Sequence, residues 1–466
     1  MNNWKELPLN DVIELVIDHR GKTPKKLGFD DFFSEGYPVL SAKHVKTSGL
    51  VNLDAMRFAN EEMYKKWMKE PTQKGDVILT SEAPLGELFY IDGSKKYVLG
   101  QRVFGLRPKS DVLDSMYLLV WLSSAEGQGR LQARATGSTV QGIKQSELLK
   151  IMIPIPPMEV QKDIASIYGS LDQKIQLNTQ INQTLEQIAQ ALFKSWFVDF
   201  DPVRAKVQAL SDGLSLEQAE LAAMQAISGK TPEELTALSQ AQPDRYAELA
   251  ETAKAFPCEM EEVDGGEVPK GWKQTTLSEI CEMQNGYAFK SSEWTDAGIP
   301  VIKIGSIQST ILTVEGNGFV SEDNLSLRSN FVLNDGDIVI GLTGAYVGKV
   351  GRMPANKKAM LNQRVAKFLA KRINESETFY SFIYMNVIQE EFKNFVDFTA
   401  QGSAQPNIST KDILKYPLLL ANNDVHLAFE KLLKKILDKS IFNSYQNEIL
   451  SNSRDLLLPR LLDGEI

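Results

Sequence analysis

The 466-residue chain has few side chains that could perform covalent or metal-dependent chemistry. Its three histidines, His19, His44 and His426, are far apart in the sequence, and so are its two cysteines, Cys258 and Cys281. Neither cysteine has a Cys or His neighbour at zinc-ligand spacing, and no Ser/His/Asp or Cys/His set can be assembled. The sequence therefore predicts no catalytic residues and no bound metal.

Three motifs of nucleic-acid enzymes are approached but incomplete. A DNA amino-methyltransferase needs an Asp/Asn-Pro-Pro-aromatic loop, and residues 156–158 and 201–203 both lack required members. Residues 344–350 resemble a phosphate loop, but the glycines are one residue too close and no Ser/Thr is present for magnesium. Glu391 and Lys393 form the Glu-x-Lys pattern of a nuclease, although a solvated helix face explains them as well. We interpret the chain as non-catalytic, with a degenerate nuclease as an alternative.

Residues suited to DNA occur at matched places in two parts of the chain. Gln101-Arg102 reappears as Gln363-Arg364, and the glycine-rich loop 136–144 reappears as 401–409. Arg pairs well with guanine, Gln with adenine, and Lys or Arg with phosphates; a strand-end salt bridge or a surface loop is the alternative. The first part contributes the candidates Arg20, Lys22, Lys25, Lys26, Lys43, Lys46, Gln101, Arg102, Arg130, Arg134, Ser138, Thr139, Gln141 and Lys144. The second contributes Tyr287, Lys290, Lys303, Tyr346, Lys349, Gln363, Arg364, Ser403, Gln405, Asn407 and Lys411.

These matches belong to an internal repeat. Short segments recur in the same order at a nearly constant separation, which is the signature of a duplicated unit. The matched pairs include residues 4–9 with 272–277, 37–40 with 299–302, 74–78 with 335–339, 100–103 with 362–365 and 171–172 with 437–438. The sequence therefore predicts two copies of one domain.

Each copy alternates short apolar runs with Gly, Pro, Asn and Asp, which predicts strands and turns. The expected strands are residues 77–80, 88–91 and 103–106 in the first copy and 338–342, 347–353 and 365–369 in the second. Helical stretches are expected near 61–69 and 115–124. Each copy should therefore be an α+β domain.

A long helix is expected after each copy. From 159 to 199, residues at steps of three and four form a heptad stripe, namely Ile164, Ile167, Leu171, Lys174, Asn178, Ile181, Leu185, Ile188, Leu192 and Ser195. A looser stripe occupies 425–458, with Leu433, Leu437, Ile441, Tyr445 and Ile449. We expect two helices of about 60 Å packed as an antiparallel, pseudo-twofold coiled coil with one globular part at each end, and Asn178 to fix their register.

The acidic excess is confined to one connector. Residues 207–271 contain 13 acidic and 4 basic side chains, whereas the remaining chain is nearly neutral. Thr231, Pro232 and Glu234 predict a helix start, and we expect short surface helices without a core. The predicted organisation is a first domain at 1–157, a helix at 158–206, the connector at 207–271, a second domain at 272–421 and a helix at 422–466.

Composition excludes several classes of protein. The chain is 43% hydrophobic and 24% charged, which is typical of a folded globular protein. No stretch is long and apolar enough for a membrane span, and the first residues do not resemble a signal peptide. We therefore expect a cytoplasmic protein.

The sequence resembles the specificity subunits of type I DNA restriction-modification systems over almost its whole length. The resemblance lies in the loop and strand leading to residues 151–161, in the tract 191–206, in Val268-Pro269-Lys270-Gly271-Trp272 and in the closing residues 457–464. The second copy departs from this pattern at 416–420, where the double proline and the Glu-x-Gln sequence are missing.

The resemblance implies two target-recognition domains that each read half of a split DNA sequence. It also implies that the helices set the spacing and dock two methyltransferase subunits, with restriction subunits in the full complex. S-adenosylmethionine, ATP and magnesium would then be bound by those partners, and this chain would bind no cofactor. A bipartite DNA-binding regulator that works without partners is the alternative from another class.

Overall fold

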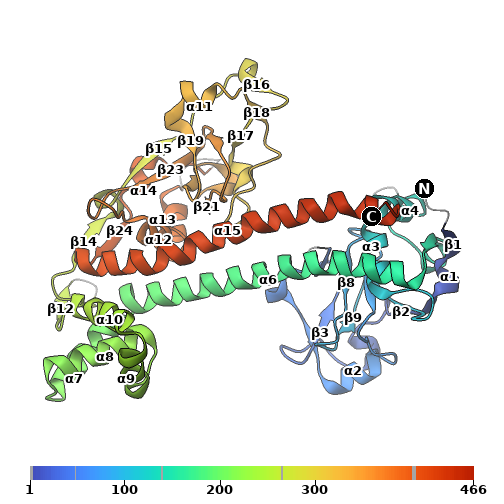
Figure 1. Ribbon diagram of the computed structural model, residues 1–466, viewed down its shortest axis with the longest axis horizontal. Coiled ribbons are helices and arrows are strands. Elements are labelled where there is room, and N and C mark those ends of the chain that lie inside the picture. The colour runs from blue at the N-terminus through green and yellow to red at the C-terminus, as the bar shows by residue number, and fades with distance from the viewer. Residues whose placement is uncertain (1–3, 48, 138–139, 264–265, 401–405, 466) are drawn as a thin grey trace. The chain divides into compact units, whose positions relative to one another are not determined.

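The computed structural model describes residues 4–47, 49–137, 140–263, 266–400 and 406–465, and it divides into two compact units (Figure 1). The first unit contains residues 1–177 and 448–466, and the second contains 178–447. Each includes one copy of the duplicated domain and part of two 40-residue helices, α6 (Met158–Phe197) and α15 (Asn423–Leu462). The expected α+β fold with two long helices is confirmed.

Each copy is built from two small sheets. In the first copy, β2 (Ile13–Asp18), β10 (Val103–Pro108), β7 (Val77–Thr80) and β8 (Leu88–Tyr90) form an antiparallel sheet in that order. The second sheet contains β6 (Phe58–Ala59), β3 (Tyr37–Leu40) and β9 (Val98–Leu99). The domain also contains helices α1 (Leu9–Val12), α2 (Glu61–Trp67), α3 (Ser115–Ser123), α4 (Ala125–Ala133) and α5 (Gln145–Leu148), and the short pair of β4 (Val45–Lys46) and β5 (Gly49–Leu50).

The second copy repeats this plan. Its four-stranded sheet has the order β15 (Cys281–Asn285), β23 (Val365–Ala370), β20 (Ile338–Gly341) and β21 (Val350–Arg352). The other sheet is made of β16 (Trp294–Thr295), β18 (Phe319–Val320), β17 (Ile299–Ile302), β22 (Ala359–Leu361) and β19 (Val332–Leu333). The strand expected at 347–353 covers only Val350–Arg352, because residues 347–348 belong to the turn that follows the 3-10 helix at 344–346.

The first strand of each copy pairs with its last. Strand β1 (Lys5–Pro8) lies antiparallel to β11 (Met152–Ile155), and β14 (Lys273–Thr276) lies antiparallel to β24 (Pro417–Leu420). This pairing explains why the residues that open and close each copy recur in the sequence. It also fixes where each long helix leaves its domain.

The repeated Gly-Asp pair joins a turn to a neighbouring strand. Asp76 is buried, accepts the Gln73 backbone N–H at 2.8 Å and pairs with Arg107 on β10 through Nε at 2.8 Å. In the second copy, Asp337 receives the Asn334 N–H at 2.7 Å and the Lys367 Nζ at 2.6 Å. The duplicated motif is therefore a structural link within the four-stranded sheet.

Replacing Asp76 with Ala should lower the free energy of unfolding by about 3–5 kcal/mol, because it leaves Arg107 with a mostly buried, uncompensated charge. Asp337→Ala is the matched control and should cost less, since Asp337 and Lys367 are 20% and 13% exposed against 1% and 15% for Asp76 and Arg107. Urea denaturation of the purified variants measures both. Equal small losses below about 1 kcal/mol would contradict this role.

Helices α6 and α15 run antiparallel, and their seam differs from the predicted stripe. Asn178 lies beside Asn447, with 2.9 Å between Nδ2 and Oδ1, whereas Asn182 donates to Ser440 O at 3.0 Å. Ile167 and Ile188, expected in the stripe, are 42% and 47% exposed. The buried positions of α6 are Gln161, Ile164, Tyr168, Gly169, Asn178, Ala189, Phe193, Trp196 and Phe197. Gln161, Tyr168, Ala189 and Trp196 are separated by multiples of seven residues, so the buried side keeps a heptad spacing. This column lies on the opposite flank of Ile164 and Asn178 from the predicted positions Ile167 and Ile188.

Asn178 is not a lone polar residue in this seam. It is almost fully buried and belongs to an amide and hydroxyl cluster in the second unit. The other members are Asn182, Ser440, Asn443, Ser444, Gln446 and Asn447. Because each donor needs a particular acceptor across the helix pair, the cluster specifies one register.

The acidic connector folds with a small core, which corrects the expectation of surface helices alone. The helix predicted at 158–206 is divided, because α6 ends at Phe197 and α7 (Asp201–Ser211) begins after a left-handed Phe200. Helices α8 (Leu216–Ser228), α9 (Pro232–Ala241) and α10 (Pro243–Ala255) follow. The capping box at Thr231 is present as predicted. Ala223, Met224, Leu235 and Ala253 are buried together, because each helix presents a narrow stripe of small and apolar residues.

Each long helix is tied to a domain by one buried polar side chain. Gln161 of α6 accepts the Asp114 N–H at 2.8 Å, at the start of α3. The Glu430 carboxylate of α15 accepts the N–H groups of Ser381 and Phe382, each at 2.9 Å, at the start of α12 (Tyr380–Val387). The second copy lacks the Glu-x-Gln sequence that supplies Gln161 in the first. Glu430 instead connects the long helix to the start of a domain helix there.

The pH dependence of stability should expose two opposite titrations on α15. Burial lowers the pKa of His426 to about 3, so the folded chain holds the imidazole neutral. The stability that this neutral imidazole contributes is lost as the pH falls below 6.5, where the unfolded chain binds a proton. Burial raises the pKa of Glu430 to about 7, so the folded chain favours the protonated carboxyl. The stability that this protonated group contributes is lost as the pH rises from 4.5 to 7. We expect the unfolding free energy of His426→Leu to fall by about 2 kcal/mol between pH 5 and pH 7, and that of Glu430→Gln to rise by about 2 kcal/mol. Denaturant titrations at both pH values test this, and parallel slopes in the two variants would refute it.

Candidate nucleic-acid interface

The repeated Gln-Arg pair forms the corner between the two sheets of each copy. Gln101 and Arg102 connect β9 to β10, and Gln363 and Arg364 follow β22 and precede β23. Arg102 and Arg364 have φ values of +65° and +68°. A positive φ is uncommon for a residue with a Cβ and is concentrated at functional sites. The same strained turn therefore exposes an arginine at both corners.

Backbone hydrogen bonds hold three segments together at each corner. In the first copy, Ser81 N–H donates to Arg102 O at 2.8 Å and Ile143 N–H donates to Ser81 O at 2.9 Å. In the second copy, Leu342 N–H donates to Arg364 O at 2.9 Å and Ile408 N–H to Leu342 O at 3.0 Å. The structure thus brings each Gln-Arg turn beside the predicted glycine-rich loop.

The glycine-rich loop of the first copy closes on itself beside the corner. Thr136 and Gly142 exchange two backbone hydrogen bonds of 2.8 and 3.0 Å. Gly137 has a φ of +116°, and a Cβ there would lie 2.1 Å from Val140 O, so no other residue fits. Gln141 and Lys144 are exposed, as is Asn407 in the second copy. The predicted residues Ser138, Thr139, Ser403 and Gln405 lie outside the described residues.

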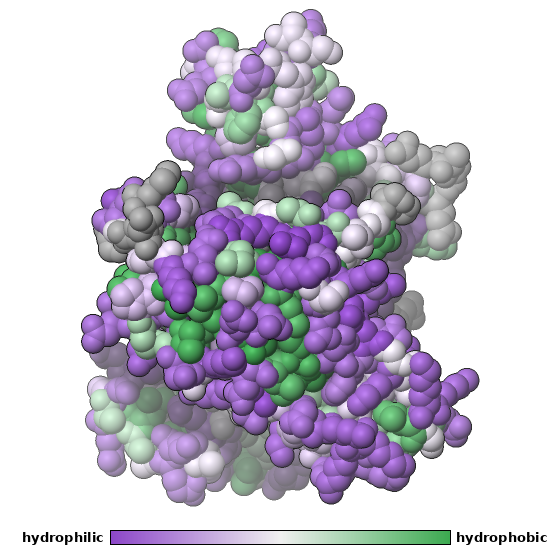
Figure 2. Space-filling view, turned by 90° about the vertical axis from the view of Figure 1, so that its right-hand side faces the viewer, coloured by the Kyte–Doolittle hydropathy of each residue, from purple (hydrophilic) through white to green (hydrophobic). Residues whose placement is uncertain are grey.

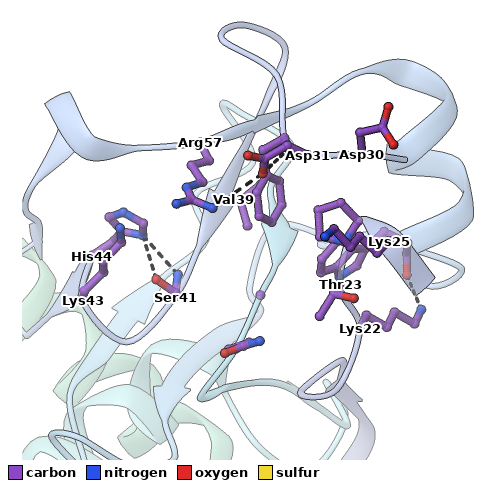
Figure 3. A pocket seen from close by; sticks show the side chains of 15 residues that line it. Lys22, Thr23, Lys25, Asp30, Asp31, Val39, Ser41, Lys43, His44 and Arg57 are labelled. Carbon is purple, nitrogen blue, oxygen red and sulfur yellow. Dashed lines mark hydrogen bonds and ion pairs between the residues drawn. The ribbon is translucent and has the colours of Figure 1, made fainter. Parts of the chain in front are cut away.

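Two pockets meet at Gln101 in the first copy. One, of about 490 Å³, is lined by Lys22, Lys25, Lys43, Arg57 and the aromatic rings of Phe32 and Trp67, with Asp30 and Asp31 at its side (Figure 3). The other, of about 500 Å³, is lined by Arg20, Glu82, Arg102, Val140 and Lys144. Gln101 lines both. Basic side chains therefore surround the exposed corner, as phosphate contacts beside a base-reading turn would require.

Several predicted cations already have protein partners. Arg20 forms a bidentate pair with Asp18 at 2.8 and 2.7 Å and lies 4.1 Å from the Phe104 ring centre. Lys22 Nζ donates to Trp67 O at 2.5 Å, and burial lowers its pKa. Arg134 pairs with Glu147, and Lys46 with Glu87. These contacts position the side chains around the pockets and leave Lys25, Lys26 and Lys43 as the more exposed cations.

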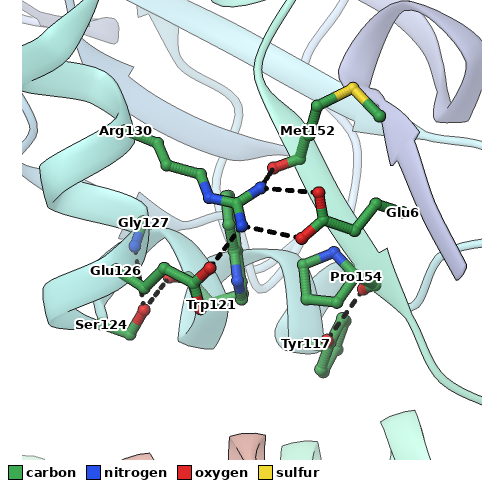
Figure 4. A network of polar contacts seen from close by, with 9 residues as sticks. All are labelled: Glu6, Tyr117, Trp121, Ser124, Glu126, Gly127, Arg130, Met152 and Pro154. Carbon is green, nitrogen blue, oxygen red and sulfur yellow. Dashed lines mark hydrogen bonds and ion pairs between the residues drawn. The ribbon is translucent and has the colours of Figure 1, made fainter. Parts of the chain in front are cut away.

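Arg130 belongs to a structural network (Figure 4). Its guanidinium donates to Glu6 at 2.7 and 3.1 Å and to Met152 O at 2.7 Å, and it lies over the Trp121 ring. These hydrogen bonds hold the pKa of Glu6 below its usual value. Because both terminal nitrogens of the guanidinium are already paired, Arg130 supports the β1 and β11 pair and is poorly suited to grip phosphate.

In the second copy, Tyr287 lies beside the corner, and three of the predicted lysines contact other side chains. Tyr287 O accepts the Gln363 N–H at 2.9 Å, and its ring is covered by Arg328 at 4.4 Å, which also pairs with Glu293 at 2.6 Å. Lys303 lies 3.9 Å over Trp294, Lys349 lies 4.6 Å over Tyr346, and the Lys290 N–H donates to Glu293. Tyr346 belongs to the 3-10 turn at 344–346, whose Gly344 N–H donates to Pro406 O next to Asn407. Lys411 is exposed on α14 (Thr410–Ile413).

Sequence reasoning missed several residues of these surfaces. Glu82 faces Arg102, Arg57 lines the larger pocket, and Arg328 stacks on Tyr287. The sequence gives little sign of these three residues, because a single charged residue in a polar stretch is ordinarily exposed to solvent. Only the offset of the repeat, which aligns Glu82 with Thr343, could have directed attention to Glu82.

The face drawn in Figure 2 is mainly hydrophilic, with small hydrophobic areas. Among the described residues, no three His, Cys, Asp or Glu side chains gather as a metal site would require. Lys393 of the Glu-x-Lys pattern pairs with Asp397 on α13 (Glu390–Thr399). In the described ranges, every helix is too short or too polar to span a bilayer.

Comparison with known proteins agrees with this geometry. The model of the type I restriction modification DNA specificity domain matches residues 1–187 and 269–424. The HindI specificity subunit of Haemophilus influenzae is 37% identical over 480 aligned positions that cover 100% of both chains. The MjaVIII specificity subunit of Methanocaldococcus jannaschii is 24% identical and covers 100% of this chain and 93% of its own.

A solved structure supports the fold independently. The S subunit of a type I restriction-modification system from M. genitalium superposes with a TM-score of 0.57 at 17% identity, over 98% of this chain and 96% of its own. The matched family model and the 37% identical relative place the protein in the class of subunits that recognise DNA sequence and are not themselves catalytic. The chain belongs to the family of type I restriction-modification DNA specificity subunits.

Proposed function

We propose that each copy reads one half of a bipartite DNA sequence and that α6 and α15 set the spacing between the halves. The observation that carries this proposal is the duplicated corner, in which Arg102 and Arg364 share the same left-handed backbone and the same hydrogen bonds. The loop residues at matched positions differ, for example Gly142 against Asn407. A common scaffold with different side chains is suited to reading two different half-sites.

The same proposal assigns the chemistry to partner subunits. Two methyltransferase subunits would dock on the helices and bind S-adenosylmethionine, while restriction subunits would use ATP and magnesium in the full complex with double-stranded DNA. The long, specified seam of α6 and α15 favours this role, because a spacer must have one length and one register.

The purified chain alone should neither methylate nor cleave DNA, and it should bind DNA weakly with poor selectivity. The second copy holds 15 basic and 15 acidic residues, so the phosphate contribution to affinity is small without partners. Adding the methyltransferase subunits should produce stoichiometric complexes and methylation at a bipartite motif. Native mass spectrometry and mapping of methylated bases measure both. Selective, tight binding by the chain alone would instead favour a partner-independent regulator.

A further inference from the structure

Glu82 faces the arginine of the first corner. Its Oε1 lies 3.1 Å from Arg102 Nε, and the two side chains are 42% and 53% exposed. Both therefore reach the surface beside Gln101, in the pocket that Lys144 and Arg20 also line. A carboxylate on a DNA-facing surface is unfavourable beside phosphates, so its presence there needs a specific reason.

The backbone holds this carboxylate as firmly as it holds the arginine. Glu82 is paired with Gly142 by an antiparallel bridge, and Ser81 is bonded to both Arg102 and Ile143. A Cβ on Gly142 would lie 3.0 Å from the Glu82 Cβ and 3.2 Å from Ser81 O, closer than ordinary packing. The glycine thus allows the loop to approach Glu82, and the acid-base pair is preorganised.

The chemistry of the pair matches one base pair. In the major groove, guanine presents O6 and N7 acceptors and its cytosine presents the N4 amino donor. Arginine suits the first and a carboxylate suits the second, whereas the thymine O4 acceptor would repel the carboxylate. We propose that Glu82 is a specificity-determining residue that reads the cytosine of the G·C pair whose guanine Arg102 contacts. This inference rests on the proposed function of the first copy.

The second copy keeps the backbone bonds of the three corner segments but has no carboxylate at the position of Glu82. Thr343 replaces Glu82 and forms the matching bridge to Asn407. Among the described residues, Arg364 has no carboxylate partner within 4.0 Å. The two copies therefore share the arginine turn but carry a carboxylate in the first and a hydroxyl in the second at the matched position. Thr343→Ala is the matched control for Glu82→Ala.

The test uses the complete complex with its methyltransferase subunits and maps methylated sites for Arg102→Ala, Glu82→Ala and Thr343→Ala. We expect the first two to relax the same single position of the first half-site, with a loss of discrimination of about 5-fold to 100-fold. Thr343→Ala should leave that half unchanged. Melting temperatures should match the parent chain, since an exposed pair contributes little to stability.

Modified DNA gives a second readout. Placing N4-methylcytosine at the relaxed position should weaken binding of the parent complex and not of the Glu82→Ala complex. If Arg102→Ala and Glu82→Ala relax different positions, or if Glu82→Ala keeps the parent motif, the inference is wrong although the half-site model stands. If the parent complex modifies no bipartite motif, the proposed function itself fails.

Discussion

Duplicating residues 178–181 within α6 should widen the unread gap of the DNA motif by one or two base pairs and leave both half-sites unchanged. Four helical residues add about 6 Å, which is slightly less than two base-pair steps of about 3.4 Å. They rotate the following residues by only about 40°, so the buried side of α6 still faces α15. Asn178 and Asn182 are four residues apart in the polar cluster. Duplicating 178–181 therefore adds another asparagine at the same four-residue spacing, so that the cluster can keep its amide hydrogen bonds.

An insertion of two residues at the same place is the matched control. It turns the following stripe by about 200°, which would bury polar residues and expose Ala189 and Phe193. We expect this variant to lose assembly with the methyltransferase subunits, as measured by native mass spectrometry. An active four-residue variant with an unchanged gap in its methylation map would show that the helices do not set the spacing.

The elements that depend on long sequence patterns were predicted well. The repeat predicted two parts of the chain with one plan, and both contain a four-stranded sheet of the same order. Strand β7 was placed at residues 77–80 as observed. Helix α6 was expected from 159 to 199 and extends over Met158–Phe197. A repeat of more than 150 residues and a helix of 40 residues contain many mutually consistent signals, so single exceptions do not disturb them.

The errors arise where neighbours in space decide the outcome. Ile167 and Ile188 fit a heptad stripe, yet they are exposed because the buried column lies on the other flank of Ile164 and contains Tyr168 and Ala189. The connector has few large apolar residues, but small side chains such as Ala223 and Ala253 pack closely enough to form a core. Arg130 is indistinguishable from a surface arginine until Glu6 and Trp121 are brought beside it.

The candidate site was predicted in its residues but not in its geometry. The recurrence of Gln101-Arg102 and Gln363-Arg364 marked both corners. Nothing in the residue types indicated a positive φ, since glycine or asparagine is the usual choice there. The pairing of Glu82 with Arg102 depends on the approach of three segments, which only the folded chain provides.

Replacing the two corner arginines separately should relax the two halves of the motif separately. Arg102→Ala should lose about 1–3 kcal/mol of discrimination at one position of the first half, and Arg364→Ala a similar amount in the second. Alanine keeps the Cβ, so the strain of the left-handed turn is the same in parent and variant. The effect therefore reports the lost guanidinium and not a relaxed backbone.

Arg102→Lys and Arg364→Lys separate base reading from phosphate binding. A lysine retains the positive charge but lacks the planar fork that guanine requires, so selectivity should fall while overall affinity and its salt dependence remain close to those of the parent. Arginines that contacted only phosphates would give the opposite result, with weaker binding in the alanine variants and an unchanged motif. Methylation maps of the assembled complexes decide between these outcomes, and relaxation spread over both halves by either single change would refute separate readers.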